Sequence, residues 1–208
     1  MNITHFWPDS SEPNTIETWR GLLSLRQATF TGFATVEASK GFIRPSSSLA
    51  TSQGQEMLRI LLFRVLEEMV ESYTSVDPDH VSEEAIDAIN YLLAVPLLDP
   101  DLISQEQLAF TLQHEVEISE ESSPHGPLDD SDLAQALVGF AGELGDMMRN
   151  RAWMNQPQDL YFSGANVLVK SVIAWVVRLV RVFPTFDLFY RFYIAKDRVL
   201  QFRLRSNY

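Results

Sequence analysis

Apolar residues recur along most of the chain at intervals of three and four positions, the spacing that places side chains on one face of an α-helix. Strand-like alternation and hairpin turn signals are scarce, so the predicted fold class is all-α. The pattern predicts helices at residues 15–30, 54–75, from a cap at Asp79 or Ser82 to about Val95, 104–117, 131–153 and 185–203.

Local residue chemistry adds detail to the predicted elements in three places. Pro96 and Pro100 are expected to end the third helix, because proline removes a backbone donor and clashes with the preceding turn. Residues 32–53 are rich in Gly, Ser and Pro and are expected to connect the first two helices. Residues 165–182 favour a helix, but their Val and Ile content leaves a strand open.

The length of 208 residues favours one main domain. Residues 1–14, which are polar and contain two prolines, are predicted to form a flexible arm. Residues 15–208 are predicted to form a single all-α domain. Within it, residues 118–130 are acidic and contain proline, which predicts a mobile loop.

Composition narrows the classes of function. The formal net charge of −12 argues against a nucleic-acid partner, because binding to a phosphate backbone needs a basic surface. No uncharged apolar run approaches the ~20 residues of a membrane span, and cysteine is absent, which fits a cytoplasmic location. Residues 65–148 contain no Lys or Arg, whereas residues 149–208 are mainly basic, so a metal and an anionic ligand could occupy different parts of one molecule.

Two acidic pairs carry the clearest chemical signal. They are Glu68-x-x-Glu71 and Glu84-x-x-Asp87, and the spacing places both members of each pair on one helix face. About ten residues of turn between the pairs allow the two helices to form an antiparallel hairpin, so that both pairs face one another. Four carboxylates arranged in this way predict an oxygen-only site for Mg²⁺, with substrate phosphates completing its coordination.

The same spacing also occurs on ordinary solvated helix faces. Glu67, Glu83, Glu143 and Asp146 could form rival pairs. The apolar residues around the two main pairs favour the metal site, because acids near a core need a partner or a cation. A carboxylate that is not fully used as a ligand, Glu67 or Glu68, could accept the proton of an attacking water.

Two segments of the chain resemble a known protein family. LEEMVES followed by EEAIDAINYLLAV is similar to the signature of the all-α nucleoside triphosphate pyrophosphohydrolases, which include MazG-like proteins and dimeric dUTPases. The ending YIAKDRVLQFRLRSNY resembles the C-terminal segment of the dimeric dUTPases. The matching positions there are Tyr193, Lys196, Phe202, Arg203 and Tyr208.

The resemblance implies a helical bundle of the dimeric dUTPase/MazG-like type that forms a homodimer. It also implies Mg²⁺-dependent hydrolysis of dUTP or a related nucleoside triphosphate to the monophosphate and pyrophosphate. The implied metal ligands are Glu68, Glu71, Glu84 and Asp87. The residues expected to carry catalysis are Glu67, Glu68 and Glu71, and those expected to bind substrate are Gln27, Asn90, Lys170, Lys196 and Arg203.

Departures from the family pattern concern the choice of base. Asp197 and Leu200 stand where the C-terminal segment of the family has asparagines. Arg26 and Phe30 stand where its first helix has a base-reading Gln and Asn, unless Gln27 substitutes. Arg only donates hydrogen bonds, whereas an amide both donates and accepts, so the sequence does not assign the base that the protein would select. The alternative is a helical binding or assembly protein that kept the scaffold without catalysis.

Overall fold

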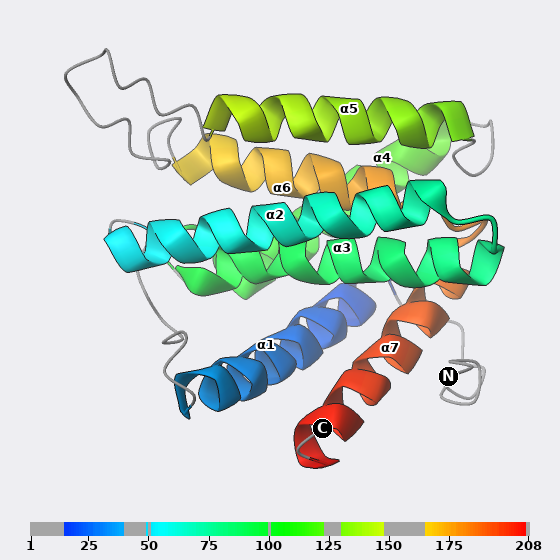
Figure 1. Cartoon of the computed structure of the whole chain (residues 1–208). Helices are drawn as coiled ribbons and strands as arrows, with labels where there is room; N and C mark the ends of the chain where they lie inside the picture. Colours follow the sequence, from blue (N-terminus) through cyan, green and yellow to red (C-terminus); the bar gives the residue numbers. More distant parts are fainter. Residues whose placement is uncertain are drawn as a thin grey trace.

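The structure, a computed structural model, describes residues 15–39, 49, 51–99, 101–122, 130–147 and 165–206. These residues form an all-α fold of seven helices without strands (Figure 1). The helices are α1 (Thr15–Ser39), α2 (Ser52–Thr74), α3 (Pro78–Leu98), α4 (Gln105–Ser122), α5 (Asp130–Met147), α6 (Ala165–Val180) and α7 (Phe186–Ser206). The all-α prediction is therefore confirmed, and α6 settles the ambiguity of residues 165–182 in favour of a helix.

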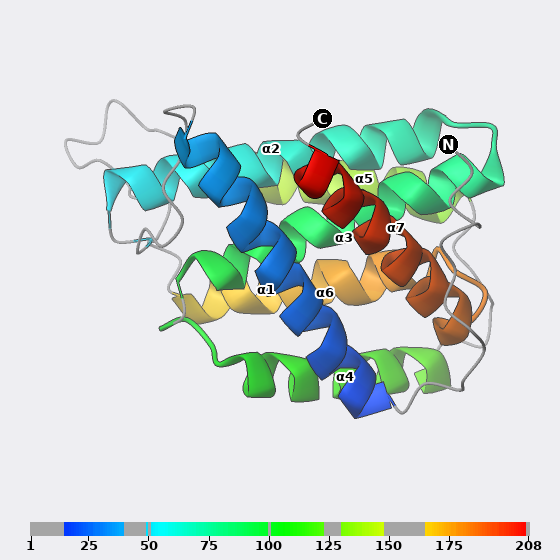
Figure 2. The same cartoon turned by 90° about the horizontal axis from the view of Figure 1, so that it is seen from below.

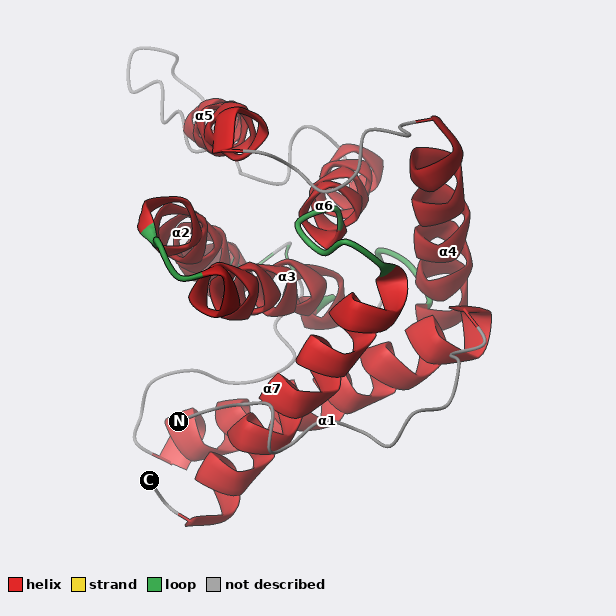
Figure 3. Ribbon diagram, turned by 90° about the vertical axis from the view of Figure 1, so that its right-hand side faces the viewer, coloured by secondary structure: helices red, strands yellow, loops and turns green. Residues whose placement is uncertain are grey.

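Helix α3 is the central element of the bundle. It forms an antiparallel hairpin with α2, and α5 and α6 lie on the side of this hairpin opposite to α1 and α7 (Figures 1 and 3). Helix α4 contacts both α1 and α6 at one edge. Because α3 has neighbours on several sides, nearly all of its side chains from Glu84 to Leu98 are buried, including the charged side chain of Glu84.

Helices α1 and α7 run side by side in the same direction (Figure 2). Trp19 contacts Phe189 at a ring-centroid distance of 5.6 Å near the start of both helices. Further along, a Cβ added to Gly32 would come within 2.9 Å of a methyl carbon of Leu204, so glycine allows a close approach there. This packing directs the middle of α7 towards α3.

The start and end of α3 differ from the prediction. Neither Ser82 nor Asp79 caps the helix; Asp77 does, and its carboxylate accepts a hydrogen bond of 3.1 Å from the Asp79 amide. Pro78 then occupies the first turn, where a missing N–H costs little. The expectation that Pro96 ends α3 is wrong, because burial of the surrounding apolar side chains holds the helix to Leu98 despite the lost bond.

Other boundaries shift outwards from the prediction. Helix α1 continues to Ser39, beyond the expected break at Gly32, because glycine weakens a helix but does not end it. Helix α4 continues to Ser122, so residues 118–122 of the predicted loop are helical; residues 123–129 of that loop, and the predicted arm at residues 1–14, lie outside the described residues. No described helix is long and apolar enough to cross a membrane.

Candidate metal centre

The hairpin of α2 and α3 fixes the positions of the two acidic pairs. The Ser72 hydroxyl on α2 donates a hydrogen bond of 3.0 Å to the carbonyl of Val81 on α3. The Ser75 amide donates to the Glu71 carbonyl and closes the end of α2, at 3.1 Å. These bonds set the register of the hairpin, so Glu71 on one helix lies opposite the first turns of the other.

The predicted ligands converge in two overlapping groups. Ligand atoms of Glu68, Glu84 and Asp87 lie within 4.8 Å of one another, and so do those of Glu71, His80 and Glu84. Glu84 belongs to both groups and is only 8% exposed. The structure thus brings together all four carboxylates that the sequence assigned to a metal, and adds an imidazole. We call these five residues the carboxylate cluster.

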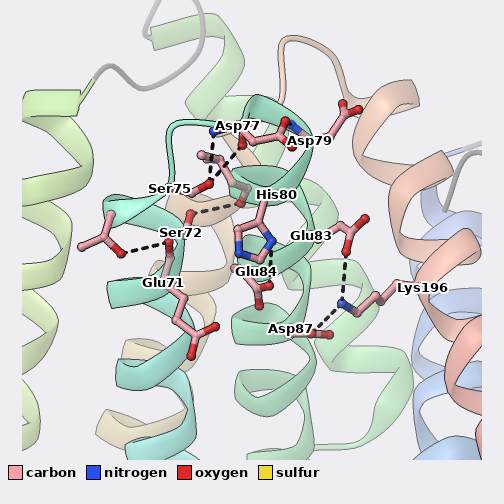
Figure 4. Close-up of polar contacts among 12 residues, drawn as sticks. Glu71, Ser72, Ser75, Asp77, Asp79, His80, Glu83, Glu84, Asp87 and Lys196 are labelled. Atoms are coloured by element: carbon pink, nitrogen blue, oxygen red, sulfur yellow. Dashed lines mark hydrogen bonds and ion pairs between the residues drawn. The ribbon is translucent and has the colours of Figure 1, made fainter. Parts of the chain in front are cut away.

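Lys196 reaches the cluster from α7 (Figure 4). Its Nζ lies 2.7 Å from Oδ2 of Asp87 and 3.8 Å from Oε2 of Glu83. The ammonium is buried apart from 11% of its side chain, so these contacts are little screened by solvent. The basic C-terminal segment therefore supplies one positive charge directly to one side of the cluster.

The opposite side of the cluster holds uncompensated negative charge. Burial, a hydrogen bond with Glu84 and the charge of Asp87 together raise the pKa of Glu68 from 4.5 to about 8. Burial also raises the pKa of Asp87, although Lys196 opposes this effect. Burial alone would lower the pKa of Lys196, but Asp87, Glu84 and Glu83 together more than offset this effect, so the pKa is raised. A metal-free cluster therefore retains a proton on Glu68 at neutral pH.

A buried polar layer lies beneath the cluster, between α1, α3 and α7. Arg26 donates a hydrogen bond of 2.8 Å from Nε to the backbone carbonyl of Asn90. Asp197 accepts bonds of 2.6 Å from Thr29 and from Gln201. Burial lowers the pKa of Arg26 from its ordinary value. The side-chain nitrogen of Asn90 is buried without a hydrogen-bond partner, so Asn90 lies one turn from Asp87 with an unused donor.

The remaining predicted site residues lie elsewhere. Glu67 is exposed and forms an ion pair with Arg64 on the same helix, so it faces away from the cluster. Gln27 donates to Thr31 and accepts from Gln105 of α4, because the neighbouring Arg26 takes the face of α1 that points to α3.

Two predicted cationic residues also lie outside the cluster. Lys170 lines a separate groove of about 570 Å³ between α4 and α6. Arg203 is exposed on α7. It follows Lys196 by seven residues, so it shares that residue's face about 10 Å further along the helix.

Sequence reasoning missed two members of this site. His80 was not singled out from the sequence, although its position four residues before Glu84 was a usable signal. Glu83 was considered only as part of a rival pair, and the structure instead shows it beside Lys196. The other rival, Glu143, accepts a hydrogen bond of 2.7 Å from the Trp175 indole between α5 and α6.

The donor set fits a hard divalent cation. Four carboxylates give more oxygen ligands than the protein can neutralise with Lys196 alone, and a buried excess of negative charge is costly without a counter-ion. Mg²⁺ prefers such oxygen ligands and usually retains waters. Comparison with family models, curated proteins and solved structures finds no match for the chain.

Proposed function

We propose that the protein hydrolyses a nucleoside triphosphate, dUTP or a related deoxynucleotide, to the monophosphate and pyrophosphate with the help of Mg²⁺. One observation supports this most strongly. The resemblance assigns four carboxylates on two helices to the metal. These carboxylates fall into two groups that share Glu84, and within each group the ligand atoms lie within 4.8 Å of one another. Lys196, assigned to phosphate on the same basis, lies directly beside them.

In this proposal Glu68, Glu71, Glu84 and Asp87 hold the cation. When bound, Mg²⁺ would neutralise charge on the phosphates and increase the acidity of an attacking water. Glu68 is the proposed proton acceptor, because it lies within the cluster and its raised pKa makes its carboxylate a stronger base than an ordinary one, once a bound cation has displaced the proton that it holds without metal. Glu67 is less suited to this role, since its carboxylate pairs with Arg64 at the surface.

Lys196 and Arg203 are proposed to bind the phosphates. Lys196 contacts Asp87 in the described structure, and a cation at the cluster would compete for that carboxylate. The freed ammonium would then be available to a phosphate oxygen a short distance away. Arg203 lies further along the same face of α7 and can meet the outer phosphates. The arrangement provides positive charge where negative charge develops during hydrolysis.

The proposal includes a homodimer. Helix α2 exposes a stripe of apolar side chains next to the cluster, with Ile60, Phe63 and Val70 between 39% and 52% exposed. A patch of this kind on a folded protein fits an interface with a second copy. Light scattering after size-exclusion chromatography should give twice the mass of the 23.7 kDa chain, whereas a monomer at all concentrations would contradict this part of the proposal.

The test is pyrophosphate release from each common deoxynucleoside and ribonucleoside triphosphate, with and without Mg²⁺. We expect turnover of at least one deoxynucleotide that requires Mg²⁺. Glu84→Gln or Asp87→Asn should lower that turnover by about 100-fold or more, because each removes a charge on which the transition state depends.

Glu56→Gln is the matched control, since Glu56 lies on the same helix as Glu68 but pairs with Arg59 at the surface. It should leave turnover unchanged. A folded protein without Mg²⁺-dependent turnover of any nucleotide would contradict the proposal and favour a non-catalytic binding or assembly protein.

A further inference from the structure

His80 adds a nitrogen donor to the carboxylate cluster. It lies in the first turn of α3, and its Nδ1 lies 3.1 Å from Oε1 of Glu84. Figure 4 shows the ring directed towards Glu84, on the side of α3 that faces α2. With Glu71 of α2, the three residues present one nitrogen and two carboxylate oxygens within 4.8 Å of one another.

The hairpin fixes this group in place. Val81 follows His80, and its carbonyl accepts the hydrogen bond from Ser72, which follows Glu71. This one hydrogen bond therefore fixes the backbone next to both Glu71 and His80. At the start of the helix, the Val81 amide donates 2.9 Å to the Asp77 carbonyl. Pre-positioned ligands of this kind bind a cation without a large cost in conformational entropy.

Charge on this side of the cluster also points to a cation. Glu84 is about nine-tenths buried, and its carboxylate also lies within 4.8 Å of ligand atoms of Glu68 and Asp87. The stretch from residue 65 to 148, which contains both helices of the hairpin beyond Arg64, has no Lys or Arg. The ammonium of Lys196 instead contacts Asp87 and Glu83. A cation bound between Glu71, His80 and Glu84 would balance the charge of the two carboxylates.

We infer that Glu71, His80 and Glu84 form a second cation position, and that His80 makes it favour a first-row transition-metal ion over Mg²⁺. The reason is the donor set. Mg²⁺ binds oxygen ligands almost exclusively, whereas imidazole nitrogen suits first-row transition metals. This inference rests on the proposed function in that it assigns the same centre two unlike positions, one with oxygen ligands only and one with mixed ligands.

The experiment uses Mn²⁺ alone as the probe, without nucleotide. Electron spin-echo spectroscopy of the Mn²⁺-loaded protein should show coupling to a ¹⁴N nucleus, because imidazole is bound directly to the ion. The coupling should disappear in His80→Gln. His114→Gln is the matched control, since His114 is on α4 and stacks with Phe110 away from the cluster; it should keep the coupling.

Competition between Mn²⁺ and Mg²⁺ provides a second measurement. His80→Gln should lower the preference for Mn²⁺ by about tenfold or more, the range caused even by loss of residues outside the coordination sphere. Absence of ¹⁴N coupling in the wild-type protein would overturn the inference, even if His80→Gln failed to fold. Coupling that persists in folded His80→Gln would overturn it as well. A wild-type protein that turns over no nucleotide but shows the nitrogen coupling would contradict the proposed function and leave this inference standing.

Discussion

The two sides of the carboxylate cluster balance their charge in different ways. On one side, Lys196 of α7 lies 2.7 Å from Asp87 and also contacts Glu83. On the other side, Glu71 and Glu84 face His80, and Glu68 keeps a proton because burial and its acidic neighbours raise its pKa to about 8. The first side carries its own counter-charge. The second is stable without metal only through a proton, which a divalent cation can replace.

Removal of the ammonium should have the largest effect on the folded protein. Lys196→Met removes the ammonium that contacts Asp87 and Glu83. Loss of one partner of a buried ion pair costs about 3–5 kcal/mol, and we expect about 2–3 kcal/mol here because the Asp87 side chain is 21% exposed. Urea unfolding without divalent ions measures the loss. Mg²⁺ should restore part of it, because a cation then replaces the missing charge.

Arg205→Met is the control for that substitution. Arg205 is on the same helix and is exposed, and its guanidinium is 3.4 Å from the Gln201 side chain. The change should alter the free energy of unfolding by less than about 0.5 kcal/mol. Equal effects of the two substitutions would show that Lys196 does not balance the cluster.

The pH dependence of stability should reveal the other side. The pKa of Glu68 is about 8 in the folded protein and 4.5 as the ordinary value. Between these values the folded state binds a proton that the unfolded state does not, so the metal-free protein loses stability as the pH rises from about 5 to 8. Glu68→Gln should remove this part of the slope, as measured by thermal unfolding across the pH range. A wild-type slope that the substitution leaves unchanged would contradict the assignment.

Glu67→Gln should produce the smallest effect. Glu67 is adjacent to Glu68 in sequence, but it is exposed and pairs with Arg64 on α2. Surface ion pairs of this type contribute about 0–1 kcal/mol. We expect a change in the free energy of unfolding below about 0.5 kcal/mol and an unchanged pH slope. A large change in either quantity would place Glu67 in the cluster, contrary to the described geometry.

Helical spacing explains why the core of the site could be predicted. Glu68 and Glu71, like Glu84 and Asp87, share a helix face because of their separation, and the short turn between the helices places the faces opposite each other. Amphipathic spacing likewise predicted the helices. These properties depend on residues close together in the chain, so local sequence carries them.

Long-range packing explains what the sequence alone could not predict. Gln27 was expected to bind the substrate. The rotation of α1 instead directs Arg26 towards Asn90 of α3 and leaves Gln27 beside Gln105 of α4. Pro96 was expected to end α3, but tertiary burial maintains the helix to Leu98. The role of Glu83 depends on Lys196, which is more than 100 positions away and reaches it only through the packing of α7.

The central claim is that the carboxylate cluster holds a divalent cation. Crystals grown with Mn²⁺, measured at a wavelength where manganese scatters anomalously, test it most directly. The account predicts an anomalous peak within about 2.0–2.3 Å of carboxylate oxygens from α2 and α3, with Glu84 among the ligands. Crystals at saturating Mn²⁺ that show no peak between Glu68, Glu71, Glu84 and Asp87 would contradict it.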